Sequence, residues 1–361
     1  MPQNTARIRV NDILLFILLL QLFLFQVPSI NATEEDSWTT KAPMPTARGS
    51  FGVAVVDGKI FAIGGKNSSI TYLTTNEMYD PVTDSWTEKK SMPTARASFG
   101  IAVYQNKIYV IGGRIANNYT YTGANEVYDP LTDTWETKKP SPTPRDGFDA
   151  NVLNGKIHLI GGKRINLPGY STQPYDVNDV YNPSSDTWTI KAPLPVAVYD
   201  YTSAVIDNKI YVIGGSGTTL NQIYNPENDT WSNGKASPYS STYGAGAATL
   251  GLMAPKRMYI MGGGSLVPID GNVIYDPEID DYSNASPLPT ARNHFGLAVV
   301  NDVLYAIGGV QGEMGGVFAV NEQYIPIGYI PEFPSWAILP LFGIITLISI
   351  IIKKRIISQE S

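Results

Sequence analysis

Short apolar runs alternate with polar turns along most of this chain, and one such run recurs six times. Each copy is an aliphatic, β-branched segment, such as the run from Lys59 to Ile63, that ends in two consecutive glycines. The pairs are Gly64 and Gly65, Gly112 and Gly113, Gly161 and Gly162, Gly214 and Gly215, Gly262 and Gly263, and Gly308 and Gly309. Successive pairs are 46 to 53 residues apart. Repetition at this period is typical of an array in which each unit buries its apolar face against its neighbours.

Each repeat predicts four strands. An alternating apolar run, such as Phe51 to Val56, precedes a polar two-residue turn, and the two together indicate a hairpin. The nearly continuous apolar run that follows is typical of an inner strand covered on both faces. A segment like Asn76 to Pro81 then gives a third strand, and an aromatic residue a few positions later marks a fourth. This aromatic residue is Trp86, Trp135, Trp188, Trp231 or, in the fifth repeat, Tyr282. We expect the large ring to fill the gap between adjacent twisted sheets.

The two ends of the repeat array do not match. The sixth repeat has its third strand at residues 321–324 but no Trp after it, whereas Trp38 stands alone before the first repeat. The segment around Ser37 to Lys41 is therefore predicted to add to the last unit as its outer strand. Closing the ring in this way removes the open interface of a linear array.

The double glycine, the Asn-Glu-x-Tyr-Asp-Pro segment and the spaced Trp together resemble the kelch repeat over roughly residues 37–326. The resemblance implies an all-β, six-bladed β-propeller with four antiparallel strands per blade, which we assign to residues 33–327. The fourth and fifth repeats depart from the pattern, because Val198 and a residue near Ser241 stand where other repeats have Arg. The fifth also carries an insertion at residues 251–257. These two blades are expected to be the least regular.

The N-terminal segment lies outside the repeats. Arg7 and Arg9 precede an apolar stretch from Ile13 to Val27, and small residues follow near Ala32. This layout predicts a secretory signal peptide over residues 1–32. An uncleaved membrane anchor is the alternative, and either interpretation implies export.

The C-terminal segment predicts a membrane anchor. Residues 336–352 are apolar and free of charge, and a basic tail follows at 353–361. We expect a single transmembrane helix with a cytoplasmic C-terminus, so that the propeller is extracellular at the cell membrane. A buried core helix is the alternative. The linker at 328–335 contains Pro331-Glu332-Phe333, and this tail resembles an archaeal PEF-CTERM sorting signal, which implies cleavage near Pro331 by a membrane sortase.

The amino-acid composition excludes several kinds of functional site. The chain has no cysteine, which excludes disulfides, zinc-thiolate sites and cysteine nucleophiles. Its net charge of −6 gives no basic footprint for nucleic acid. Glycosylation sequons are predicted to be used at Asn67, Asn118, Asn228 and Asn284, while a fifth, Asn31, lies in the signal segment.

Enzymatic activity has few candidates. Kelch-type copper oxidases use a Tyr–Cys crosslink, which this chain cannot form, and the repeated boxes of sialidases are missing. A relative of the sialic acid mutarotase type stays open. Candidates for proton transfer near the expected central opening are Asp146, Asp149, Tyr199, Asp200 and His294. The other histidine, His158, is expected to be packed on an inner strand, so neither a metal site nor another cofactor is predicted.

Two residue sets are candidates for ligand binding. The first is an Arg at one equivalent position in four repeats, expected near the central opening, where it suits an anionic ligand. Its members are Arg48, Arg96, Arg145 and Arg292. The alternative is that these arginines bond carbonyls or acidic side chains of the blades. The second set lies in the long loops between second and third strands and consists of Tyr119, Tyr121, Tyr170 and Tyr175. Tyrosine-rich loops on a rigid frame are typical of binding surfaces, although a propeller also exposes such loops without any role in binding.

The sequence as a whole favours a protein- or glycan-binding or adhesion module at the cell surface over an enzyme. The alternative function is an extracytoplasmic sugar-processing enzyme of the sialic acid mutarotase (epimerase) type.

Overall fold

The computed structural model describes residues 34–67, 71–240, 243–264, 267–312 and 316–330. The expected signal segment, the Pro-Glu-Phe motif, the predicted transmembrane helix at 336–352 and the basic tail lie outside these residues. Within the described ranges, no helix is long and apolar enough to cross a membrane. The described residues from Glu35 to Ile330 belong to one compact unit.

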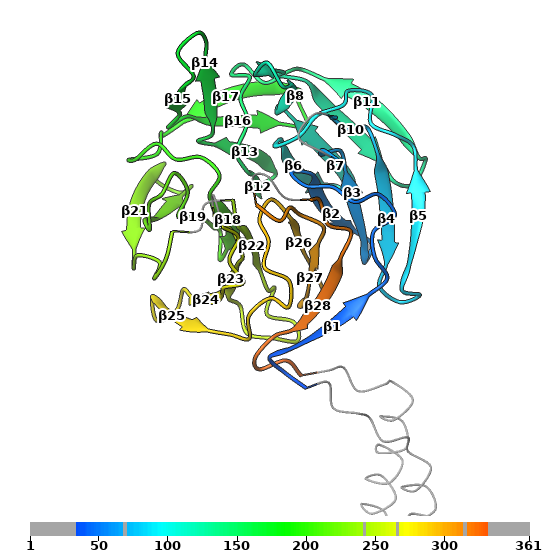
Figure 1. Cartoon of the computed structure of the whole chain (residues 1–361). Coiled ribbons are helices and arrows are strands. Elements are labelled where there is room, and N and C mark those ends of the chain that lie inside the picture. The colour runs from blue at the N-terminus through cyan, green and yellow to red at the C-terminus, as the bar shows by residue number, and fades with distance from the viewer. Residues whose placement is uncertain (1–33, 68–70, 241–242, 265–266, 313–315, 331–361) are drawn as a thin grey trace, which may run out of the picture. The chain divides into compact units, whose positions relative to one another are not determined.

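This unit is built from six four-stranded antiparallel sheets arranged around an axis (Figure 1). The first three blades run from the innermost strand outward as β2 (Gly52–Val56), β3 (Lys59–Ile63), β4 (Asn76–Asp80) and β5 (Ser85–Lys89); β6 (Gly100–Tyr104), β7 (Lys107–Ile111), β10 (Asn125–Asp129) and β11 (Thr134–Lys138); and β12 (Ala150–Leu153), β13 (Lys156–Ile160), β16 (Asn178–Asn182) and β17 (Thr187–Lys191). The predicted all-β, six-bladed fold with four strands per blade is confirmed.

The other three blades follow the same order. They consist of β18 (Thr202–Ile206), β19 (Lys209–Ile213), β20 (Asn221–Asn225) and β21 (Thr230–Gly234); β22 (Ala245–Ala248), β23 (Met258–Met261), β24 (Asn272–Asp276) and β25 (Asp281–Asn284); and β26 (Gly296–Val300), β27 (Val303–Ile307), β28 (Asn321–Ile325) and β1 (Ser37–Lys41). Two short hairpins stand outside the blades, namely β8 (Arg114–Ala116) with β9 (Thr120–Tyr121) and β14 (Lys163–Asn166) with β15 (Ser171–Pro174).

The N-terminal strand closes the ring, as predicted. β1 pairs antiparallel with β28, and Trp38 lies opposite Tyr324. The indole ring packs 4.9 Å from the Tyr324 ring, as the Trp of the third blade, Trp188, packs 4.9 Å from Tyr181. The first and last parts of the propeller are therefore joined by a complete sheet.

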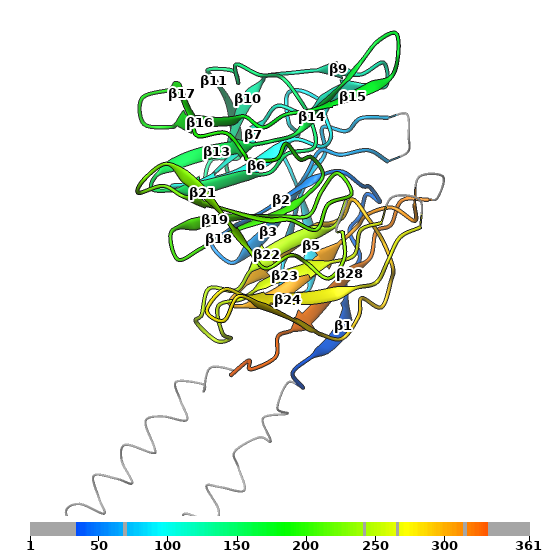
Figure 2. The ribbon, with the colours of Figure 1, turned by 90° about the vertical axis from the view of Figure 1, so that its left-hand side faces the viewer.

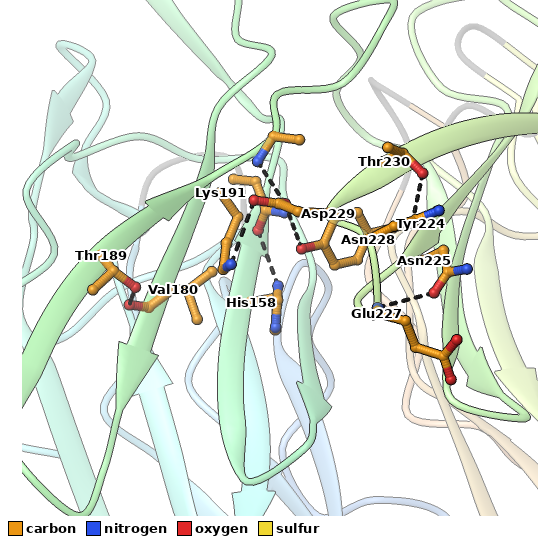
Figure 3. Close-up of polar contacts among 12 residues, drawn as sticks. His158, Val180, Thr189, Lys191, Tyr224, Asn225, Glu227, Asn228, Asp229 and Thr230 are labelled. Carbon is orange, nitrogen blue, oxygen red and sulfur yellow. Dashed lines mark hydrogen bonds and ion pairs between the residues drawn. The ribbon is translucent and has the colours of Figure 1, made fainter.

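Neighbouring blades are joined on their outer side by a repeated contact that we call the aspartate–tryptophan clamp. In the third blade, Asp186 accepts a hydrogen bond from the backbone N–H of Lys139 in the second blade at 2.9 Å. Trp188 donates to the C=O of the same residue at 3.0 Å, and Tyr181 donates to the Asp186 carboxylate at 2.6 Å. The clamp aspartates are Asp36, Asp84, Asp133, Asp186, Asp229 and Asp280. Figure 3 shows the Tyr224–Asp229 bond of the fourth blade.

Six backbone hydrogen bonds close a second circle around the axis, which we call the axial ring. Each bond runs from the N–H of one blade to the C=O of the preceding blade, with N···O distances of 2.8 to 3.1 Å. The members are Ser50, Ser98, Gly147, Asp200, Tyr243 and His294. All six have left-handed backbone conformations, with φ between 52° and 68°. The chain turns sharply here because it passes from an outer strand to the next innermost strand.

Close contacts within and between blades explain why the repeats carry Gly pairs. The N–H of Gly65 donates to the carbonyl of Arg96 in the next blade at 2.9 Å, and its φ is +91°. A Cβ at this position would lie 2.6 Å from the Cβ of Phe51. Only glycine allows both the conformation and the close approach.

Regularity differs from the expectation in one blade. The fifth blade is irregular as predicted, since β22, β23 and β25 are one residue shorter than most strands and an insertion follows β22. The fourth blade, however, is regular. Val198 replaces the usual Arg and is fully buried, while Gln222 takes the place of the third-strand acid and bonds the backbone of Val196 at 2.9 and 3.1 Å. Both charges are replaced together, so no charge is left unpaired.

Ring closure predicts that Trp38 and Trp188 are energetically equivalent. Replacing either with Ala removes the same clamp bond and ring contact, and we expect each change to lower the free energy of unfolding by about 3 kcal/mol, the lower end for a large packed aromatic. Urea unfolding of the two variants measures this. An unchanged midpoint for Trp38→Ala beside a lowered one for Trp188→Ala would contradict closure by the N-terminal strand.

Candidate functional site

The four repeated arginines do not line the central opening. Each side chain has an exposed fraction of 0 % and pairs with an acid on the third strand of its own blade. The pairs are Arg48 with Glu77, Arg96 with Glu126, Arg145 with Asp179 and Arg292 with Glu322, at 2.5 to 2.8 Å. Further bonds go to backbone carbonyls, such as Arg96 to Val110 at 3.0 Å. Their predicted role as a converging anion site is therefore wrong, and the alternative of bonding within the blades holds.

Burial lowers the pKa of Arg96 to about 10, against the opposing effect of Glu126, so the guanidinium still carries its charge at neutral pH. A buried ion pair with both partners hydrogen-bonded holds strands in place but leaves no group for a ligand. These arginines belong to the frame of the propeller.

A different set of cations lies at the axial opening on the face of the long loops. Lys66, Arg114 and Lys163 each follow a Gly pair. Each forms a β-bridge with the residue that follows the repeated Arg of its own blade, namely Gly49, Ala97 and Asp146. The same position in the last three blades holds Ser216, Gly264 and Val310. The positive charge is therefore gathered over the first three blades.

Two carboxylates form ion pairs with two of these three cations. Arg114 lies 3.6 Å from Asp146, and Lys163 forms an ion pair with Asp200 across the boundary between the third and fourth blades. Lys66 has no carboxylate within ion-pair distance among the described residues and lies 5.7 Å from the centre of the Tyr72 ring. We call these five charged residues the mouth site. When both acids are ionised, one positive charge is in excess.

Burial sets the pKa values at the mouth site. It lowers the pKa of Lys66 to about 8, with Arg114 and Lys163 contributing to the fall. It raises the pKa of Asp146 to about 6, because Lys163 and Arg114 offset only part of the desolvation. Lys66 is thus mainly charged at neutral pH, and Asp146 changes its charge near pH 6.

Several buried polar atoms of the site lack a hydrogen-bond partner in the described part of the chain. They are Oδ1 of Asp146, Nε of Arg114 and the hydroxyl of Tyr72. Buried polar atoms are nearly always hydrogen-bonded to protein or to a bound molecule. Their concentration at one place gives the site free donors and acceptors for a ligand or water.

Two hairpins form an aromatic wall beside the mouth site. Tyr119, at the β8–β9 turn, and Tyr170, at the β14–β15 turn, meet edge to face at 5.9 Å. Tyr121 accepts a hydrogen bond from the N–H of Ile165 at 2.8 Å, which ties one hairpin to the other. Tyr170 is 67 % exposed at the tip. Figure 2 shows the β14–β15 hairpin extending beyond the blades on this face. We call these three residues the tyrosine wall. Tyr175, half-buried at its foot, bonds the Gly162 carbonyl through its N–H at 2.8 Å.

The predicted proton-transfer candidates divide between two levels. Asp146 and Asp200 belong to the mouth site, and the Tyr199 ring lies 4.5 Å from the Lys163 ammonium. His294 belongs to the axial ring and stacks on Tyr243 at 4.3 Å. Burial, with the nearby Lys163, lowers the pKa of His294 to about 3, so the ring is neutral at physiological pH. Catalytic roles for these residues stay a prediction.

Asp149 lies deeper, in the channel along the axis. Its carboxylate accepts a hydrogen bond from Ser203 at 2.9 Å, and Ser203 accepts one from Asn151 at 2.9 Å. Asp149, Asn151 and Ser203 all line a cavity whose other walls are mainly glycine, aliphatic and aromatic residues in and next to the innermost strands. Burial raises the pKa of Asp149 to about 6.

The remaining candidates lie away from the mouth. His158 is packed on β13 and bonded to Asn178 at 3.1 Å, as expected for a core residue (Figure 3). Asn67, Asn118, Asn228 and Asn284 are all exposed, and their glycosylation stays a prediction. No cluster of three potential metal-ligating side chains occurs in the residues that the structure describes.

The mouth cations were missed by sequence reasoning, although a signal was present. In the first three repeats a basic residue directly follows the Gly pair, and in the last three it does not. This asymmetry marks one side of the ring as different.

Comparison with known proteins supports the fold. A family model described as the KLHDC2/KLHL20/DRC7 Kelch-repeats domain matches residues 18–162, and a Kelch motif model matches residues 197–236. This chain belongs to the kelch-repeat β-propeller family.

Among relatives of this kelch chain, the Kelch-like protein terF of Aspergillus terreus is 32 % identical over 151 residues, which cover 36 % of this chain and 31 % of that protein. Kelch-like protein 23 of mouse is 26 % identical over 156 residues, covering 42 % of this chain and 27 % of that one. The matches thus span about a third or less of these curated relatives. The solved structure of YjhT aligns with a TM-score of 0.67 at 15 % identity, over 78 % of this chain and 95 % of that chain. This likeness shows the shared fold alone.

Asp149 predicts a pH dependence of stability. The buried carboxyl keeps its proton up to about pH 6, whereas the unfolded chain loses it near pH 4, so charging the group costs native stability as pH rises between these values. We expect Asp149→Asn to match the native chain at pH 4 and to exceed it by about 1–2 kcal/mol at pH 7. Urea unfolding at both pH values measures the difference. An equal difference at pH 4 and pH 7 would contradict the assignment.

Proposed function

We propose that this kelch propeller is an exported, membrane-anchored module that binds a protein or glycan at the cell surface through its loop face. Both ends of the described chain leave the propeller on the face opposite the mouth site (Figure 2). An anchor formed by residues 336–352 would leave the mouth site and the tyrosine wall directed away from the membrane. The exposed hairpin tips would then be free to meet a partner.

The mouth site carries the proposal. Three cations facing two carboxylates leave one positive charge for a negative group of the ligand, and Lys66 forms no ion pair among the described residues. Guanidinium and ammonium groups bind carboxylates through charge-assisted hydrogen bonds. The tyrosine wall supplies apolar surface with little loss of side-chain entropy. These features favour a ligand that combines an acidic group with an apolar or sugar ring face.

A sugar-processing enzyme of the sialic acid mutarotase type is the second candidate. One observation favours it: Asp146 is 2 % exposed, has an unpartnered oxygen and has a pKa raised to about 6 by burial. A carboxyl that titrates near neutrality beside cationic groups is suited to move a proton on a bound acidic sugar.

Binding by the full-length chain to glycan and acidic-peptide arrays tests the first function. We expect Arg114→Ala and Lys66→Ala each to weaken binding about tenfold, as expected for loss of one charge-assisted contact. Arg257→Ala is the matched control, because Arg257 pairs with Asp276 at 3.3 Å on the opposite face. Undiminished binding by both mouth variants would refute the site.

A turnover assay distinguishes the mutarotase-type enzyme from the binding module. Exchange of the anomers of N-acetylneuraminic acid, followed by NMR, would be accelerated by the native chain and lost in Asp146→Asn if the enzyme is real. A binding module would show no acceleration and would keep its ligand in Asp146→Asn.

Processing of the chain follows from export. We propose glycans on Asn67, Asn118, Asn228 and Asn284, supported by the exposure of these side chains, and a mature chain that keeps the anchor at residues 336–352. Cleavage near Pro331 by a membrane sortase, with transfer to another anchor, is the alternative. Mass spectrometry of the native protein should show added hexose mass on these residues and a chain that ends at Ser361. Absence of the added mass would contradict the glycans, and a C-terminus near Pro331 would contradict the retained helix.

A further inference from the structure

The face opposite the mouth site carries both exits of the described chain. The turns after the first and third strands of every blade lie there, because antiparallel strands return to the same end. β1 begins and β28 ends on this side, and the N–H of Gly328 donates to Glu35 at 2.5 Å, which holds the two exits together. We call this surface the exit face (Figure 2).

The fifth blade departs from the others on this face. Its turn between β22 and β23 is an insertion at residues 249–257 that exposes two leucines, Leu250 at 59 % and Leu252 at 70 %. Ile330, 70 % exposed, lies beside them, because its N–H donates to the carbonyl of Met253 at 2.7 Å. We call Leu250, Leu252 and Ile330 the leucine patch.

The insertion is held in one shape by a buried carboxylate. Asp302, 0 % exposed in the sixth blade, accepts hydrogen bonds from the N–H groups of four residues at 2.5 to 3.1 Å. The donors are Leu250, Leu252, Met253 and Ala254. These bonds lower the pKa of Asp302 despite the cost of its burial, so it stays ionised. A loop fixed in this way exposes its leucines as part of a defined surface.

Both basic side chains of the insertion are paired. Lys256 pairs with Asp207 at 2.6 Å, and Arg257 pairs with Asp276 at 3.3 Å. The patch is therefore an apolar projection with no unpaired cation from its own loop beside it.

The position of the predicted membrane anchor indicates what the leucine patch contacts. Only five residues separate Ile330 from the apolar segment that begins at Trp336. Five or six extended residues reach at most about 20 Å. A patch so close to a membrane-spanning segment lies within reach of the lipid headgroups.

We propose that the leucine patch rests in the outer surface of the lipid bilayer, so that the propeller contacts the membrane on its fifth-blade side. This inference rests on the membrane anchoring of the proposed function. Leucines held at the headgroup and acyl boundary bury apolar surface there without spanning the membrane. The contact fixes the direction of the mouth site relative to the membrane.

The absence of cysteine allows a direct test, because a single introduced thiol can be labelled uniquely. The full chain carrying Leu252→Cys and an environment-sensitive fluorophore is reconstituted into vesicles with spin-labelled lipids. We expect its emission to fall roughly twofold or more when the spin label lies at the headgroup boundary. Adding Leu250→Asp should restore the emission without releasing the chain from vesicles.

Two labelled positions are the controls. Leu131→Cys lies on the exit face but in the second blade, opposite the fifth in the ring, and Tyr170→Cys lies on the mouth face; both are well exposed. Both should show less quenching than Leu252→Cys. Equal quenching at residues 252 and 131 in a chain that floats with vesicles would overturn the patch contact while leaving the anchor intact. A chain that does not float with vesicles would refute the anchor, and the lipid contact with it.

Discussion

On its outer side, each blade of this propeller is fastened to the next by one residue whose backbone N–H and C=O both form hydrogen bonds with the neighbouring blade. The aspartate accepts the N–H, the tryptophan or, in the fifth blade, Tyr282 donates to the C=O, and a buried tyrosine fixes the aspartate. Hydrogen bonds to a charged acceptor are stronger than neutral ones. Since the chain has no cysteine, these bonds and the blade cores must hold the ring without cross-links. Asp36 and Trp38 of the closing strand complete the clamp on Ser286 between the fifth and sixth blades, and Asp84 and Trp86 complete the one on Ala42 between the sixth and first blades.

Packing of consecutive blades around the axis assembles the mouth site. Lys66 comes from the first blade, Arg114 from the second, Asp146 and Lys163 from the third and Asp200 from the fourth, and the axial ring sets the spacing between them. The buried Arg–acid pairs stiffen the first, second, third and sixth blades, and removing one partner of such a pair costs about 3–5 kcal/mol. A rigid frame of this kind presents its charged groups without further ordering when a ligand arrives. The frame and the site thus use different basic residues for different purposes.

Much of the fold could be predicted from the sequence, because the glycine pair repeats six times and the spaced aromatic residue repeats with it, as Trp in five copies and as Tyr282 in the remaining copy. Trp38, left over at one end, also predicted the closing strand. The direction of the arginine side chains could not be predicted in this way. Arg96 starts near the axis, but its guanidinium turns toward Glu126, a residue two strands further along the chain. The sequence shows where an Arg lies along its strand. It does not show which acidic residue, distant in the sequence, the guanidinium will pair with inside the blade.

The mouth site, too, could be predicted only in part from the sequence. Asp146, Tyr199, Asp200 and His294 were expected near the opening, and they lie there, because their positions follow from the repeat. Lys163 was missed because its partner Asp200 belongs to the next blade and no local pattern links the two. Regularity of the fourth blade was also missed, since Val198 and Gln222 compensate each other across strands. Pairs formed across strands or blades depend on the closed ring, which becomes visible only in three dimensions.

Native-state hydrogen exchange at the two boundaries of the sixth blade, which β1 completes, tests the central claim most directly. A closed ring predicts slow exchange for the amide of Ser286, bonded to Asp36 between the fifth and sixth blades, and for the amide of Ser50, bonded to His294 between the sixth and first blades. Both should exchange as slowly as the amides of Lys139 and Gly147, which occupy the equivalent positions elsewhere in the ring. Exchange at Ser286 and Ser50 that is orders of magnitude faster than at Lys139 and Gly147 would show that the ring opens at the sixth blade. That result would contradict closure by the N-terminal strand.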